Sequence, residues 1–226
     1  MSSATADELK EIGTTTLSDA LDRLGIEGQC LGIKPFAHQM RLAGPAFTIR
    51  MLPVGVHGGS VGDYIDDVEP GQIVVIDNDG RLDATVWGDI LTMVATRRGI
   101  GGTVIDGVCR DIDRSLELGY PIFARGNAMR TGKDRVTADA MNVPVQVAGV
   151  RIAPGDWLVG DGDGIVALPA SRLEEILLTA RQIAAAEAKI RAAVEAGERL
   201  DKARERVRYH ALQSWPARGG LLASHG

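Results

Sequence analysis

Arg110 and Asp111 are neighbouring residues whose side chains could bind a small acid together. They directly follow residues 102–105, an apolar run that predicts a buried strand ending in a turn. Proteins of the α/β class bind ligands at the carboxyl ends of their strands. An arginine can hold a carboxylate through two parallel hydrogen bonds, and an aspartate can supply an oxygen ligand to a divalent cation. The pair therefore predicts a metal-assisted site for a small keto acid.

A simpler interpretation of the same two residues also stands. Arg110 and Asp111 could form an ion pair on the surface, with Asp111 capping a short helix that begins at Ile112. Residues 106–111 alone favour neither interpretation.

Gly88, Asp89, Ile90 and Leu91 precede this motif and open a predicted helix over residues 89–98. Backbone N–H groups at the start of a helix lack partners within the helix, and the helix dipole attracts negative charge there. If Asp89 begins the helix, these groups can bind a carboxylate or an enolate oxygen. The alternative is an ordinary N-cap formed by Asp89.

Short apolar runs and helical patterns are mixed along the chain, which indicates the α/β class without a regular strand–helix–strand rhythm. Helices are predicted over residues 16–24, 89–98, 112–118 and 171–196. Strands are predicted at residues 46–51, 72–77, 104–105, 122–123, 145–147, 157–159 and 165–168. A turn at residues 78–80 is expected to end the second of these strands.

Four motifs, in their order and spacing, make the sequence resemble the RraA-like family. They are Gly88-Asp89-Ile90-Leu91, Asp106-Gly107-x-x-Arg110-Asp111, Pro121 to Gly126, and Asp161 to Pro169. The resemblance runs from about Thr14 to the C-terminal helix. The family includes class II, metal-dependent aldolases that act on 4-hydroxy-4-methyl-2-oxoglutarate or 4-carboxy-4-hydroxy-2-oxoadipate. It also includes RraA, a ribonuclease E inhibitor without that catalytic role.

The resemblance implies an α/β fold of a particular kind. This is a three-layer β/β/α sandwich resembling the swivelling phosphohistidine domain, with a long C-terminal helix. Residues 1–226 are then expected to form a single domain, including a helical C-terminal arm over residues 171–226. The length and a hydrophobic content of 45% are sufficient for one substantial core.

The C-terminal arm opens with a capping box, Ser171 to Glu174, and continues as a helix about 39 Å long at about 1.5 Å per residue. Its apolar stripe consists of Leu173, Ile176, Leu177, Ala180, Ile183, Ala184, Ile190 and Val194. Such a stripe would be exposed unless a neighbouring chain covered part of it, which favours a homo-oligomer. The resemblance implies a homotrimer or homohexamer in which an adjacent chain contributes a C-terminal glutamate. Glu187 is the candidate, and a solvent-facing glutamate is the alternative.

The composition argues against two classes of partner. A net charge of −5 and an aromatic content of 4% do not suit a surface that tracks phosphates or stacks bases. Residues 1–8 lack the pattern of a signal peptide, and no apolar run is long enough to cross a membrane. We therefore expect a cytoplasmic protein that binds neither nucleic acid nor membranes.

Other reactive side chains suggest no competing chemistry. The lysines lie in polar, terminal or helical segments, which argues against a Schiff-base enzyme. Cys30 and Cys109 are interpreted as reduced thiols, and Cys109 as a small buried residue because no histidine base is near it in sequence. The isolated histidines lack the spacing of a zinc site; they are His38, His57, His210 and His225.

Two glycine-rich segments are not expected to bind ligands. Residues 99–102 follow a helix and precede a strand, the reverse of the order in a dinucleotide-binding turn. Residues 161–164 resemble the start of a calcium loop, but Ile165 and Arg172 stand where oxygen ligands are required. That segment predicts a tight turn between two strands.

The residue pair and the resemblance together imply a divalent-metal-dependent, pyruvate-forming lyase. Asp111, and through water Asp89, would hold Mg²⁺ or Mn²⁺, while Arg110 binds the carboxylate of a small oxo-acid substrate and stabilises the enolate. A water assisted by Glu187 or Asp89 would act as the base. Retro-aldol cleavage and oxaloacetate decarboxylation share that enolate, so both activities are expected. The alternative is a non-catalytic RraA-type regulator of ribonuclease E that acts by protein binding.

Overall fold

The computed structural model describes residues 3–55, 60–207 and 209. The chain divides into two compact units, of which the first comprises residues 1–14 and 28–173 and the second residues 15–27 and 174–226. Part of the C-terminal arm and three of the four histidines lie outside the described residues; the histidines are His57, His210 and His225.

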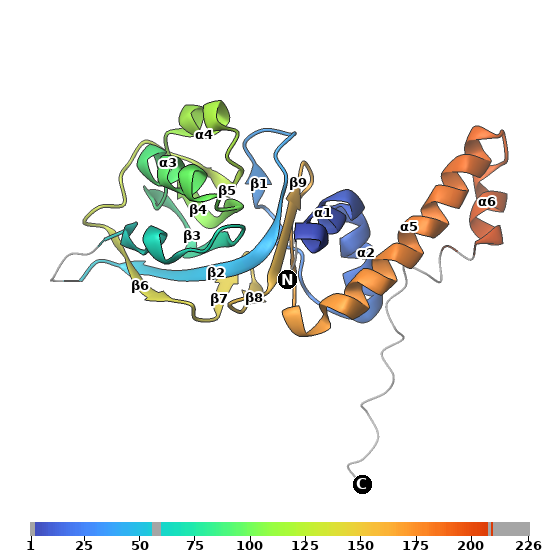
Figure 1. Cartoon of the computed structure of the whole chain (residues 1–226), viewed down its shortest axis with the longest axis horizontal. Helices are drawn as coiled ribbons and strands as arrows, with labels where there is room; N and C mark the ends of the chain where they lie inside the picture. Colours follow the sequence, from blue (N-terminus) through green and yellow to red (C-terminus); the bar gives the residue numbers. More distant parts are fainter. Residues whose placement is uncertain (1–2, 56–59, 208, 210–226) are drawn as a thin grey trace, which may run out of the picture. The chain divides into compact units, whose positions relative to one another are not determined.

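An eight-stranded mixed sheet forms the centre of the first unit. Its strand order is β1-β5-β4-β3-β2-β9-β10, and β6 also pairs with β2. Strands β2, β3, β4 and β5 are parallel to one another, whereas the other pairings are antiparallel. The long β2 thus connects the parallel strands to the antiparallel ones (Figure 1). The bounds are β1 Lys34–Pro35, β2 Leu42–Pro53, β3 Ile73–Thr85, β4 Gly102–Cys109, β5 Ile122–Asn127, β6 Val136–Met141, β9 Trp157–Asp161 and β10 Gly164–Leu168.

Different layers cover the two faces of this sheet (Figure 1). The covering elements are the helices α3 Asp89–Arg98 and α4 Ile112–Leu118, and the hairpin strands β7 Val145–Val147 and β8 Val150–Ile152. Ile76 and Ile105 pack into the cluster on the helix side, whereas their neighbours Val75 and Val104 pack with the hairpin. This division follows from the two-residue period of a strand. The mixed α/β fold of three layers expected from the sequence is thereby confirmed.

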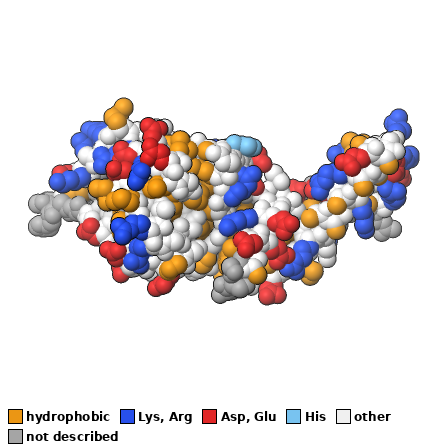
Figure 2. All heavy atoms as spheres, turned by 45° about the horizontal axis from the view of Figure 1, so that its top comes forward, with side chains coloured by type: hydrophobic (Ala, Val, Ile, Leu, Met, Phe, Trp, Pro, Cys, Tyr) orange, Lys and Arg blue, Asp and Glu red, His pale blue; other side chains and the backbone are white. Residues whose placement is uncertain are grey.

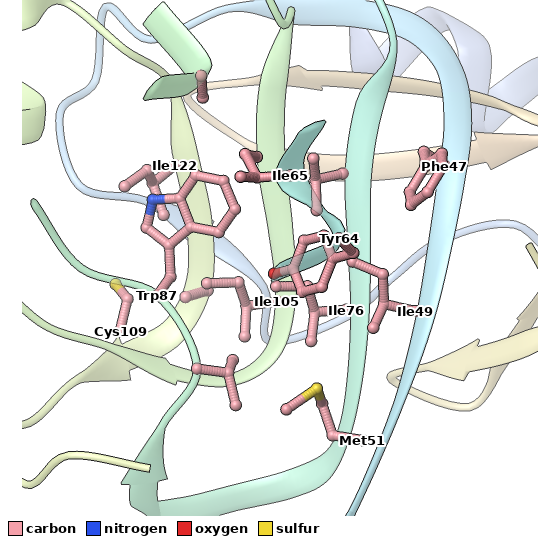
Figure 3. Close-up of a cluster of buried hydrophobic side chains, with 14 of the residues drawn as sticks. Phe47, Ile49, Met51, Tyr64, Ile65, Ile76, Trp87, Ile105, Cys109 and Ile122 are labelled. Atoms are coloured by element: carbon pink, nitrogen blue, oxygen red, sulfur yellow. The ribbon is translucent and has the colours of Figure 1, made fainter. Parts of the chain in front are cut away.

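Figure 3 shows the buried cluster on the helix side of the sheet. Tyr64 enters it from the 3-10 helix η1 (Asp63–Asp67), and Trp87 enters from the segment between β3 and α3. The Trp87 ring stacks on Tyr120, with 6.0 Å between centroids, and its Nε1 donates a hydrogen bond to Thr92 Oγ1 at 2.9 Å. These contacts fix the residues immediately before α3.

Strand β3 continues through the turn that was expected to end it. Asp79 and Gly80 have φ angles of 53° and 65°, and the pairing of β3 with β4 shifts register there. Asp79 N donates to Asp77 Oδ1 at 3.1 Å, and the buried Asn78 side chain donates to Ala84 O at 3.2 Å. The predicted end of the strand at residue 77 was wrong because these contacts turn the backbone locally and return it to the same sheet.

Local signals placed several helices correctly. Helices α3 and α4 have the predicted bounds, and both end at a glycine in the left-handed conformation, Gly99 and Gly119. Helix α2 (Thr14–Leu24) ends before Gly25, as predicted, although it begins two residues earlier. Elements that were not predicted are α1 Ser3–Ile12, η1, β1, β6 and β8. Helix α6 Leu200–Arg206 lies within the expected helical C-terminal arm, but beyond the helix predicted over residues 171–196.

The turn at residues 161–164 joins β9 to β10, as predicted. Asp161 accepts hydrogen bonds from Thr14 N at 2.8 Å, from Thr14 Oγ1 at 2.6 Å and from Asp163 N at 2.9 Å. Burial by itself raises the pKa of the Asp161 carboxyl, but these hydrogen bonds outweigh it, so the pKa lies below its ordinary value. The carboxylate therefore anchors the N-terminal segment to the sheet.

The second unit is helical, and most of α2, α5 (Leu173–Glu195) and α6 belong to it. Arg23 of α2 donates a hydrogen bond to Gln182 of α5 at 3.3 Å. The predicted capping box does not open α5, because Ser171 lies in a 3-10 turn (Ala170–Arg172) and the α-helix begins at Leu173. None of the described helices combines the length and hydropathy needed to cross a membrane.

The apolar stripe of α5 differs from the prediction at its C-terminal end. Ile176, Ala180 and Ile183 are fully buried within the single chain, as the pattern indicates. Val194, however, is 43% exposed, and Ala193 is buried instead, in a cluster with Ile190 and Ala203. Apart from Ala184 and Val194, the stripe is buried within the single chain, so it does not by itself support the inference of an oligomer.

Candidate functional site

The backbone brings the two predicted site segments together at the carboxyl ends of β3 and β4. The pairing of these parallel strands continues beyond β4, since Val86 N donates to Val108 O at 3.2 Å and Arg110 N donates to Trp87 O at 3.0 Å. Arg110 therefore lies beside the first turn of α3. Its position follows from the sheet register rather than from sequence proximity.

Asp111 adopts a backbone conformation that is unusual for a residue other than glycine, with φ 57° and ψ 41°. It stands at the N-cap position of α4, but its side chain makes no capping hydrogen bond there. Instead, Oδ2 accepts a hydrogen bond from Asp89 N at 3.2 Å. Asp111 is therefore directed toward the N-terminus of α3, and the interpretation of it as a cap of its own helix was wrong.

Gly88 makes space for this arrangement. A Cβ atom at this position would lie 2.8 Å from Asp111 Oδ2 and 3.2 Å from Arg110 Nε. Its backbone is extended, with φ −156°, so any residue could adopt the dihedral angles. Gly88 is needed because the two charged side chains pass directly over it.

Arg110 and Asp111 do form an ion pair, with Nε 3.3 Å from Oδ2 and both side chains 40% exposed. The surface-pair interpretation is therefore correct in part. The pair leaves binding capacity, because Asp111 Oδ1 and the two Nη groups of Arg110 have no partner within the described part of the chain. These atoms are free to bind a cation and an anion, respectively.

The N–H groups at the start of α3 are less open than expected. Gly88, not Asp89, occupies the N-cap position. The N–H of Asp89 is engaged by Asp111, and that of Ile90 donates to Asp89 Oδ1 at 2.8 Å. The expected anion site over residues 88–91 is corrected accordingly, because the chain's own carboxylates already occupy two of its N–H groups.

A pocket of about 370 Å³ adjoins this cluster. The first turn of α3, Trp87 and Arg110 form one side, and the segment from Ser60 to Asp66, which includes η1, forms another. This second segment was missed by sequence reasoning, because it carries no motif and reaches the site only through tertiary folding.

Acidic and basic side chains are interspersed over the face of the first unit drawn in Figure 2.

A second arginine in the site region has a different use. Arg125 pairs through Nε with Asp106, whose side chain is only 7% exposed and which also accepts a hydrogen bond from Ala148 N at 2.7 Å. Arg125 thus compensates a buried carboxylate between the sheet and the hairpin. Arg130 is exposed and does not line the pocket.

Neither cysteine is suited to act as a nucleophile. Burial raises the pKa of the Cys109 thiol to about 12, and it does the same to Cys30. Both cysteines are free thiols and Cys109 is buried, as predicted, and Cys30 is buried as well.

A cation at this site would depend on few protein ligands. The described residues contain no group of three histidine, cysteine, aspartate or glutamate side chains positioned to hold a metal ion. Mg²⁺, however, commonly keeps several waters and takes only one or two carboxylates. Asp111 and Asp89, both exposed and joined by a hydrogen bond, fit that requirement.

Glu187 belongs to the second unit. Its side chain is 22% exposed; Oε1 accepts a hydrogen bond from Tyr209 Oη at 2.8 Å, and Oε2 lies 3.4 Å from Arg191 Nη1. Burial and the neighbouring Glu187 raise the pKa of Tyr209 to about 12. Glu187 is therefore not a purely solvent-facing residue, because its carboxylate has partners within the second unit. Arg110 belongs to the first unit.

A model of the RraA-like family, described as Aldolase/RraA, matches residues 14–167, more than half of the chain. The chain belongs to the RraA-like family. Among solved structures, this RraA-like protein is similar to an uncharacterized protein from Pseudomonas syringae pv. tomato, with a TM-score of 0.83 and 42% identity over 90% of this chain and 98% of that one. It is also similar to RraAS2 of Streptomyces coelicolor, titled an unusual member of the RNase ES inhibitor RraA protein family. That match has a TM-score of 0.74 and 30% identity over 80% and 91% of the two chains.

Curated relatives of this RraA-like protein differ in length. DlpA of Legionella pneumophila is 39% identical over 92% of this chain, but this chain spans only 34% of DlpA. A protein of Halalkalibacterium halodurans named "Putative 4-hydroxy-4-methyl-2-oxoglutarate aldolase" is 36% identical over 77% of this chain and 81% of its own length.

Proposed function

We propose that this protein is a divalent-metal-dependent, pyruvate-forming lyase that cleaves a 4-hydroxy-2-oxo acid by a retro-aldol reaction in the cytoplasm. The observation that carries the proposal is the direction of the Asp111 carboxylate. It leaves its own helix uncapped and meets Arg110 and the N-terminus of α3 over Gly88. In the described part of the chain, this combination leaves a carboxylate oxygen without a partner beside guanidinium Nη groups without a partner.

Asp111 would hold Mg²⁺ or Mn²⁺ directly, and Asp89 would contact it through water. When bound, such a cation acts as a Lewis acid that polarises the keto group and stabilises negative charge that develops on its oxygen. Asp111 Oδ1 has no other partner in the described part of the chain, and the partial exposure of the site admits the remaining water ligands.

Arg110 would bind the substrate carboxylate through its two Nη groups. Its Nε remains paired to Asp111, so the guanidinium is held in one orientation before substrate arrives. The same positive charge would favour the enolate of pyruvate over the neutral keto acid. The remaining N–H groups of Gly88 and Leu91 would add hydrogen bonds at the α3 N-terminus.

The base would remove the proton from the 4-hydroxyl group of the substrate. Asp89, through water, is one candidate, because it lines the pocket beside Arg110. Glu187 is the other, supplied by the adjacent subunit of a homotrimer or homohexamer. Its contact with the exposed Arg191 at 3.4 Å is weak enough to be exchanged.

Oxaloacetate decarboxylation would use the same residues. Loss of CO₂ from oxaloacetate generates the pyruvate enolate directly, so the arginine and the acidic pair would serve both reactions, whereas the base is needed only for the retro-aldol cleavage.

A second candidate function is regulation of a ribonuclease E by protein binding. The similarity to RraAS2, whose title places it in an RNase ES inhibitor family, favours it. A protein-binding module, however, does not require an arginine that lines a pocket beside an aspartate with an oxygen that has no partner in the described part of the chain.

Pyruvate release from a set of oxo acids tests the proposal. We expect release that EDTA abolishes and Mg²⁺ or Mn²⁺ restores, and Asp111→Ala should prevent the restoration. The matched control is Asp113→Ala, an exposed aspartate two residues further along in α4. Pyruvate release from none of the oxo acids, or full activity in EDTA, would contradict the proposal.

A further inference from the structure

The charges around the pocket are unequal. Among the described residues that line it, Arg110 is the one basic side chain, whereas Asp63, Asp66 and Asp89 are acidic. Arg98 is near this wall but is engaged, since its Nη1 lies 3.6 Å from Asp66 Oδ1 and its Nη2 donates to Asp66 O at 2.8 Å and to Val68 O at 3.2 Å. One guanidinium fork binds one carboxylate. Asp66 is paired with Arg98, but a second carboxylate near Asp63 would meet no further cation among the described residues that line the pocket.

Part of the pocket wall is apolar and closely packed. Val61 and Ile65, from the η1 segment, and Leu91 and Val94, from α3, line the pocket and pack against the buried cluster. A Cβ atom on Gly62 would lie 2.9 Å from Leu91 Cδ2, so the two sides of the wall are already in contact. Burial of a hydrocarbon group against such a surface would stabilise the complex, whereas burial of a charged group there would cost hydration free energy.

We infer that the physiological substrate has a single carboxylate and that its distal part, which leaves as the aldehyde or ketone, is neutral and apolar. The inference rests on the proposed function and names its substrate class. The C3–C4 bond breaks, the 4-hydroxyl loses its proton to the base, and a proton is added at C3. The products are pyruvate and a neutral carbonyl compound with an alkyl or aryl substituent.

Competing substrates test this inference with the full chain and Mg²⁺. We compare kcat/KM for a 4-hydroxy-2-oxo acid bearing an alkyl or aryl group at C4 with that for the dicarboxylate 4-hydroxy-4-methyl-2-oxoglutarate. We expect the kcat/KM of the wild type to be at least about tenfold higher for the monocarboxylate. The dicarboxylate lacks the apolar contact and brings into the pocket a charge that has no partner.

A charge reversal in η1 sharpens the test. Asp63→Lys places a cation at the pocket and should raise kcat/KM for the dicarboxylate by about tenfold. Asp67→Lys is the matched control, because Asp67 is an exposed aspartate of the same 3-10 helix that does not line the pocket. Thermal melting of both variants checks that they fold alike.

The outcomes separate this inference from the proposed function. Pyruvate release with a preference for the dicarboxylate, or equal effects of Asp63→Lys and Asp67→Lys, overturns the inference and leaves the lyase standing. No pyruvate from any substrate overturns both. A preference for the monocarboxylate that Asp63→Lys alone weakens supports the inference.

Discussion

Asp111 and Asp161 are both aspartates at the end of a strand, and both lie in motifs that resemble the same family, yet their surroundings are opposite. Asp161 is 9% exposed, and both its oxygens accept hydrogen bonds from the backbone or side chain of Thr14 and from Asp163. The Asp111 side chain is 40% exposed, has a strained backbone and keeps one oxygen free of described partners. A carboxylate whose oxygens are all used holds the fold together, whereas one with an open oxygen can act on a ligand.

The largest effect is expected at Arg110, the partner of the open carboxylate. Arg110→Lys keeps the charge but loses the planar fork, so kcat/KM for pyruvate release should fall by about 10²- to 10³-fold. The midpoint of urea unfolding should hardly change, because the side chain is 40% exposed. A nearly unchanged kcat/KM would return Arg110 to the role of a surface ion-pair partner.

Glu187 is intermediate between the two aspartates. Its Oε1 accepts a short hydrogen bond from Tyr209, whereas its Oε2 makes only a longer contact with Arg191. Glu187→Gln keeps an acceptor for Tyr209 but removes the charge, so turnover should fall by roughly 10²-fold with little loss of stability. Tyr209→Phe is the control: it removes the hydrogen bond and leaves the carboxylate, and turnover should persist. Equal turnover in both variants would assign Glu187 a structural role only.

Asp161→Asn should have the opposite effect to Arg110→Lys, because it should lower stability and leave activity unchanged. The free energy of unfolding should drop by about 2 kcal/mol at neutral pH, because hydrogen bonds to a charged group are lost, while kcat of the folded protein stays the same. The pKa of Asp161 is lowered on folding, so its contribution is present above the unfolded value of about 3.9 and disappears as the pH falls through the folded value. The difference between wild type and variant should therefore shrink below about pH 4 in urea unfolding. A difference that is constant with pH would contradict this.

The smallest effect is expected from a buried polar group that has no partner. The Tyr64 hydroxyl is buried without a hydrogen-bond partner in the described structure, whereas that of Tyr120 lies 2.9 Å from Thr103 Oγ1. Tyr64→Phe should raise the free energy of unfolding by about 1 kcal/mol, and Tyr120→Phe should lower it by a similar amount. Urea unfolding measures both, and a loss of stability in Tyr64→Phe would show that its hydroxyl is bonded in solution.

Local sequence signals predicted much of the fold. The bounds of α3 and α4 were correct because Gly99 and Gly119 end them in the left-handed conformation, a preference readable from the residue type. The short strands β1, β6 and β8 were missed, because two to six residues form a strand only when a partner is present. The exposure of Val194 likewise depends on which neighbour covers the end of α5.

The site was predictable in its residue types but not in its geometry. Arg110 and Asp111 stood out as an adjacent pair after an apolar run, and Asp89 as the start of a helix. The left-handed backbone of Asp111, the space over Gly88 and the η1 wall arise from contacts between distant segments. No periodicity reports such contacts, so the two occupied N–H groups of α3 could not have been anticipated.

Binding of Mn²⁺, followed by electron paramagnetic resonance, tests most directly the claim that Asp111 is an open carboxylate. The wild type and the Asp113→Asn control should reduce the signal of free Mn²⁺ equally, and Asp111→Asn should lose at least about tenfold in affinity. Equal binding by wild type and Asp111→Asn would contradict the account.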